Sequence, residues 1–87
     1  MKIKSGYEIK SLEGVNIVVP TDSSMSFSGV ITLNDTALFV WNLLQNDTVE
    51  SEIVDKMAVE YDAPRDVLEA DVKDLINSFR ENGLLDE

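Results

Sequence analysis

The spacing of hydrophobic positions along the chain changes at about residue 34. Before this point apolar residues alternate with polar ones, as at Val15, Ile17 and Val19, which is typical of a strand with one apolar face. The Glu13-Gly14 pair favours a tight hairpin turn, because glycine tolerates a positive φ. The expected strands cover about residues 7–12, 15–20 and 27–33.

After residue 34 the apolar residues recur every three or four positions, which predicts three helices. Asn34 is a good N-cap for the first helix, since its side-chain oxygen can accept from a backbone N–H of the first turn. Asp47 or Thr48 is expected to cap the second helix, and Gly83 is expected to end the third in the left-handed conformation. The expected helices cover about residues 35–45, 48–60 and 64–82.

The apolar stripes of the helices mark the expected core. The single tryptophan, Trp41, is expected there, as are Leu84 and Leu85, which follow the last helix and fold back. The stripe of the second helix is Val49, Ile53, Met57 and Tyr61, and that of the third is Leu68, Val72, Leu75, Ile76 and Phe79.

Three strands followed by three short helices place the chain in the α+β class, with helices covering the apolar face of a three-stranded antiparallel sheet. This arrangement is winged helix-turn-helix-like, a shape usually found on DNA. The chain has 87 residues and no linker or repeat, so we expect one domain over residues 1–87.

Composition excludes most catalytic and nucleic-acid-binding classes. The chain has no cysteine and no histidine, which removes a thiolate nucleophile, a zinc ribbon and an imidazole base. A formal charge of −10 would repel a phosphate backbone or an anionic membrane, so neither is expected as a partner. No apolar run is long enough for a membrane span or resembles a signal peptide, and the cytoplasm is the expected location.

Carboxylates alone can bind magnesium or calcium, and Asp66, Asp71 and Asp74 can approach one another on the third helix. Their spacing matches no calcium loop, and no His, Cys or Gly-rich phosphate loop completes such a site. A solvated acidic face is therefore favoured over a metal site, and no cofactor is expected.

An ordered set of residues resembles one known family over nearly all the chain. These residues are Leu33-Asn34, Thr36-Ala37, Trp41, Leu43-Leu44, Thr48-Val49, Ile53-Val54, Tyr61, Asp71-Val72 and Gly83-Leu84-Leu85. In this order and spacing they resemble pyrroloquinoline quinone biosynthesis protein D, the PqqD-like domains also called RiPP recognition elements. One departure is Asn46-Asp47, where the family usually has Asp-Gly, and it changes only a turn.

The resemblance implies a protein without catalytic activity that binds the leader segment of a ribosomally made precursor peptide. Such proteins present the leader to a modifying enzyme, often a radical S-adenosylmethionine enzyme. The leader adds as an extra strand to the edge of the third strand, in a groove against the third helix. On this sequence the implied strand edge is Phe27, Ser28, Gly29, Val30, Ile31 and Thr32, and the implied groove wall is Val67, Asp71, Asp74 and Ser78.

Strand addition is physically reasonable without the resemblance, because an unpaired strand edge offers N–H and C=O groups that an extended peptide can satisfy. A peptide-binding module is therefore the leading hypothesis. The alternatives are an acidic winged-helix adaptor that binds another folded protein through its helices, and a small metal-dependent enzyme.

Overall fold

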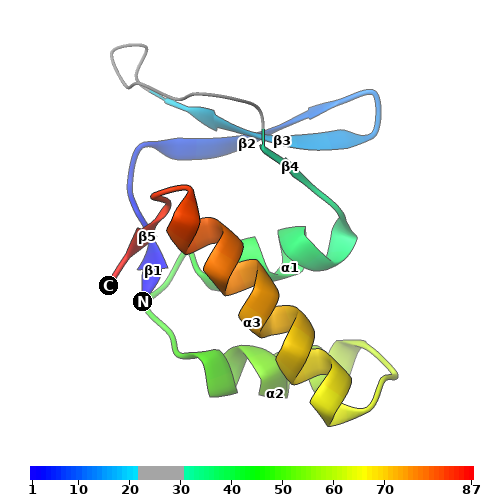
Figure 1. Cartoon of the computed structure of the whole chain (residues 1–87). Coiled ribbons are helices and arrows are strands. Elements are labelled where there is room, and N and C mark those ends of the chain that lie inside the picture. The colour runs from blue at the N-terminus through cyan, green and yellow to red at the C-terminus, as the bar shows by residue number, and fades with distance from the viewer. Residues whose placement is uncertain (22–30) are drawn as a thin grey trace.

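Two small sheets and three helices make up the computed structural model, which describes residues 1–21 and 31–87 (Figure 1). The sheet β2-β3-β4 lies at one end of the molecule and the helices pack below it. The elements in chain order are β1 (Lys2–Ile3), β2 (Tyr7–Leu12), β3 (Val15–Pro20), β4 (Ile31–Leu33), α1 (Asp35–Leu43), α2 (Glu50–Glu60), α3 (Arg65–Glu81) and β5 (Leu85–Asp86). The predicted α+β class, a three-stranded antiparallel sheet followed by three helices, is confirmed. The first part of the predicted third strand, Phe27 to Val30, lies outside the described residues.

The β2-β3 hairpin turns through Glu13 and Gly14, whose φ angles of 51° and 80° are both positive, as a type I′ hairpin turn requires. This turn fixes the register of the sheet. Ile9 pairs with Val18 and Val18 pairs with Ile31, so these three side chains share one face. Val18 is only 1% exposed, which identifies this face as the one that packs on the helices.

The alternating residues Val15, Ile17 and Val19 share the opposite face, so the expectation that helices cover their face is wrong. Val15 is 44% exposed. The reason is that the buried face of the sheet depends on the apolar residues of all three strands together. Tyr7, Ile9, Ile31 and Leu33 join Val18 on the inner face, and this set outweighs the alternation of one strand.

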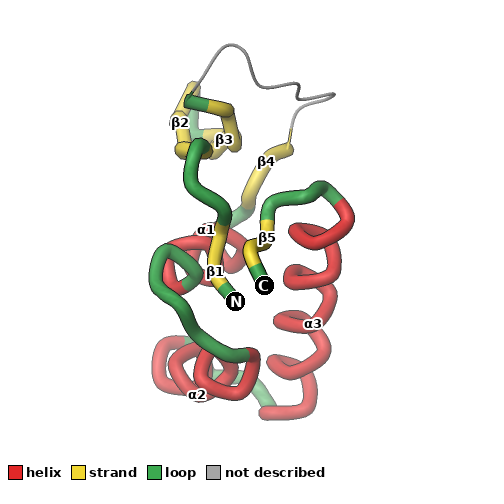
Figure 2. Tube along the Cα trace, turned by 90° about the vertical axis from the view of Figure 1, so that its left-hand side faces the viewer, coloured by secondary structure: helices red, strands yellow, loops and turns green. Residues whose placement is uncertain are grey.

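A second sheet, which the sequence did not predict, pairs β1 with β5 and brings the two chain ends side by side (Figure 2). Ile3 pairs with Leu85, and its N–H donates to the carbonyl oxygen of Leu44 at 2.8 Å. Gly83, at φ 71°, ends α3 in the left-handed conformation as predicted. Leu84 and Leu85 are buried, so the predicted return of the chain onto the core is confirmed.

Helix α1 begins as predicted, because the side-chain oxygen of Asn34 accepts from the N–H of Ala37 at 2.8 Å. Trp41 on this helix is buried, as expected. Its ring meets that of Phe79 on α3 edge to face, with the ring centroids 5.8 Å apart. This contact packs α1 against α3.

The start of α2 differs from the prediction. Its N-cap is Val49, with no side-chain hydrogen bond, so neither Asp47 nor Thr48 caps it. Asp47 instead accepts from the amino-terminal ammonium at 2.7 Å, and the Thr48 hydroxyl donates to Glu52 at 3.0 Å. Val49 has an extended backbone and is 53% exposed, because it precedes the helix and so does not follow the helical spacing of Ile53.

Candidate functional site

Strand β4 forms one edge of the three-stranded sheet. It pairs with β3 on one side, and among residues 1–21 and 31–87 no strand pairs with its other side. Figure 2 shows β4 on the side of the sheet nearer to α3. Ile31 and Thr32 lie on this edge, whereas the other four residues of the predicted edge, Phe27 to Val30, are outside the described residues. The described edge can therefore offer backbone donors and acceptors to an extended peptide.

The predicted groove wall occupies one face of α3. Val67, Asp71, Asp74 and Ser78 are spaced by four, three and four residues, so they lie on one side of the helix. All four are exposed. They flank the buried stripe of the same helix, which packs on the core.

A depression of about 270 Å³ joins this face of α3 to the start of α1. Its lining is Asn34, Thr36, Asp71, Asp74 and Leu75. The structure thus brings Asp71 and Asp74 together beside the residue that directly follows β4. Val67, Ser78, Ile31 and Thr32 do not line the depression.

Sequence reasoning did not assign Asn34, Thr36 or Leu75 to this site. The predicted core stripe includes Leu75, but the structure shows this residue only partly buried. On the helix Leu75 lies between the fully buried residues of α3 and Asp71, and this position could have indicated that it borders the site. Asn34 was explained by its capping role, which gives no indication that it also faces α3.

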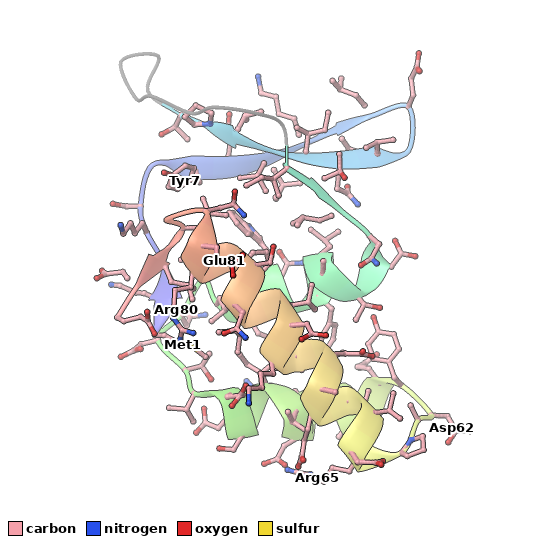
Figure 3. All side chains as sticks on the ribbon, viewed as in Figure 1. Met1, Tyr7, Asp62, Arg65, Arg80 and Glu81 are labelled. Carbon is pink, nitrogen blue, oxygen red and sulfur yellow. The ribbon has the colours of Figure 1, made fainter. Side chains whose placement is uncertain are left out.

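The charges of α3 are divided between its two flanks. Its basic residues, Arg65, Lys73 and Arg80, lie on the flank away from Asp71 and Asp74. Figure 3 shows Arg65 and Arg80 at the two ends of the helix. In the described residues, neither Asp71 nor Asp74 has a lysine or arginine within ion-pair distance.

Both arginines pair with carboxylates other than Asp71 and Asp74. Arg65 lies 2.7 Å from Asp55, and its hydrogen bond to that carboxylate raises the pKa of the guanidinium. Arg80 lies 2.7 Å from Glu87, and this hydrogen bond lowers the pKa of the Glu87 carboxyl. The positive charges of both arginines are therefore neutralised by these exposed pairs. The flank that carries Asp71 and Asp74 remains acidic.

The acidic residues of the described chain do not gather into a metal site. Within residues 1–21 and 31–87, no three Asp, Glu, His or Cys side chains are grouped so that they could hold an ion. In the same ranges no charged or polar side chain is buried, and no helix is long and apolar enough to cross a membrane.

Comparison with known families and structures adds to this geometry. Residues 16–85 match the model of the family described as coenzyme PQQ synthesis protein D (PqqD). No curated protein matches the sequence.

Two solved structures share the fold. A structure of TbiB1 in complex with the TbiA(beta) leader peptide is 22% identical, covers 99% of this chain and 95% of its own, and has a TM-score of 0.76. A lasso peptide synthetase B1 complexed with the leader peptide is 20% identical, covers 95% of this chain and 93% of its own, and has a TM-score of 0.72.

Proposed function

The chain belongs to the PqqD family, and from this premise we propose that it binds the leader segment of a ribosomally made precursor peptide. The family match also confirms the resemblance drawn from the sequence. The observation that carries the proposal is the edge of β4, which pairs with no described strand other than β3 and lies beside an exposed face of α3. Both similar structures are complexes of their proteins with leader peptides, which supports the same role here.

In the proposed complex the leader lies as a fourth strand along β4. Its backbone hydrogen-bonds to those backbone groups of β4 (Ile31–Leu33) that point away from β3, and alternate side chains point toward α3. Leu75 in the depression offers an apolar contact for one of them. The proposed site is completed on the helix by Val67, Asp71, Asp74 and Ser78.

A leader segment is disordered when free, so binding must offset the conformational entropy that it loses. Affinity is then set by a few apolar side chains that reach the groove rather than by the total number of contacts. The backbone hydrogen bonds give register and orientation.

In this proposal the chain performs no reaction of its own. Residues 1–87 form one binding domain in the cytoplasm, which presents the leader to a separate modifying enzyme. A radical S-adenosylmethionine enzyme is the partner class that the family resemblance implies.

A titration tests the proposal. The probe is a synthetic leader peptide encoded by a short reading frame next to the gene, added to ¹⁵N-labelled protein. We expect amide shift changes at Ile31 and Thr32 and along residues 67–78 of α3. Changes concentrated on α2 (Glu50–Glu60) instead would contradict strand addition and favour a protein-protein adaptor.

A further inference from the structure

The acidic flank of α3, defined here as Asp71 and Asp74, carries charge that the chain does not neutralise. Both carboxylates are exposed and line the depression at the start of α1. A third carboxylate, Glu81, follows Asp74 two turns later, and Figure 3 shows it near the end of α3 that lies closer to the sheet. With Glu81, the row of carboxylates continues along α3 from the depression toward the sheet.

The cations of the chain lie elsewhere. Residues 22–30 contain no lysine or arginine, so all seven basic residues belong to the described ranges. Three of the seven are on α3, and all three lie on its other flank. The two arginines among them already pair with Asp55, Glu69 and Glu87. No rearrangement of an existing ion pair is needed for Asp71 and Asp74 to receive a cation from another molecule.

We infer that the groove selects a basic leader, with lysine or arginine where the peptide passes the acidic flank. This inference rests on the proposed function. A peptide on the edge of β4 carries its alternate side chains toward α3, and a long cationic side chain can lay its methylene groups against Leu75 while its charge reaches the carboxylates. A glutamate or aspartate at the same place meets two like charges.

The size of the selection follows from the exposure of these carboxylates. An exposed ion pair contributes modestly, so each correct pair changes affinity by about 1.4- to 5-fold. Two pairs together amount to about 2- to 25-fold, enough to discriminate between leaders but less than the apolar contacts supply. The contribution falls as salt rises, because exposed charges are screened.

The experiment selects binders from a displayed library of random 12-residue peptides. The wild-type chain is compared with the Asp71→Asn/Asp74→Asn double variant. The matched control is Glu60→Gln/Asp62→Asn, which changes the net charge equally at the end of α2, where Figure 3 shows Asp62 far from the sheet. All four side chains are exposed, so each variant is expected to fold, and circular dichroism checks this.

The expected result is enrichment of lysine and arginine among peptides bound by the wild type and by the control. The Asp71→Asn/Asp74→Asn variant loses this enrichment, and it binds the best wild-type peptide about 2- to 25-fold more weakly in 0.1 M salt. The control binds that peptide with unchanged affinity.

Two results would overturn the inference, and only the second would also overturn the proposed function. If the recovered peptides shift the amides of Ile31 and Thr32 but show no basic enrichment, the charge selection fails and the proposed function stands. If no peptide binds, or if the shifts fall on α2, the inference and the proposed function fail together.

Discussion

Strands β1 and β4 are both short, with two and three residues, but their outer edges differ. β1 has β5 on one side, and on its other side the N–H of Ile3 donates to the carbonyl oxygen of Leu44 at 2.8 Å. β4 has β3 on one side, and no strand among the described residues on the other. The fold closes the edge that holds the chain ends, whereas within residues 1–21 and 31–87 the edge beside α3 stays unpaired.

The difference separates a part of the molecule that stabilises the fold from the part that we propose binds a peptide. The closed region buries Ile3, Leu84 and Leu85 against the helices, and burial of apolar surface is the main favourable term in folding. At the edge of β4 Thr32 is exposed, and no other described strand pairs with that side. Damage to the first region should cost stability, whereas damage to the second should cost affinity.

The largest expected effect is in the closed region. Leu84→Ala removes a fully buried side chain, and we expect the free energy of unfolding to fall by about 2–5 kcal/mol, as for other buried leucines. Urea unfolding measures the loss. Peptide affinity of the molecules that remain folded should not change, and a matching loss of affinity would show that the two regions are not separate.

An intermediate effect is expected at the junction of the regions, because Asn34 both caps α1 and lines the depression. Asn34→Ala leaves the N–H of Ala37 without its acceptor and should lower stability by about 0.5–2 kcal/mol. Asn34→Ser restores a capping oxygen and should recover most of the stability, as read from urea midpoints. Equal loss in both variants would contradict the capping role.

The smallest effect is the pH dependence of two exposed pairs in the closed region. The hydrogen bond from the amino-terminal ammonium lowers the pKa of Asp47 from its usual 3.8, and Arg80 lowers the pKa of Glu87 from its usual 4.5. A lowered carboxyl pKa adds stability above the usual value, and this stability is lost as the pH falls through the lowered one.

This pH dependence is tested by comparing the urea midpoints of the wild type and the Asp47→Asn/Glu87→Gln variant. We expect the wild type to have the higher urea midpoint at pH 7, and the difference should shrink as the pH falls below about 4. A difference that is the same at pH 7 and pH 3 would show that these pairs do not contribute through their charge.

The fold could be predicted from the sequence where a signal was local. Asn34 marks the start of α1, Gly83 the end of α3, and Glu13-Gly14 the hairpin, because each depends on the chemistry of adjacent backbone groups. The pairing of β1 with β5 could not be predicted, because strands of two residues have no period and the paired residues, Lys2↔Asp86 and Ile3↔Leu85, are 84 and 82 residues apart. The buried face of β3 could not be predicted from the alternation of β3 alone either, because the residues of β2 and β4 that pair with it determine which face packs on the helices.

The candidate site was predictable in part for the same reason. The helical spacing of Val67, Asp71, Asp74 and Ser78 was enough to place them on one face of α3. The contribution of Asn34 and Thr36 depends on how α1 packs against α3, which no local pattern encodes.

The most direct test of the open edge is an N-methyl scan of a bound peptide. In a paired strand, alternate backbone N–H groups point to the same neighbour, so methylating every residue in turn probes them one at a time. If the peptide adds to β4 as a strand, its affinity falls by about 2- to 12-fold at alternate positions, which is the value of one hydrogen bond, and stays nearly constant at the positions between them. A loss with no period of two along the residues that bind would contradict strand addition to β4.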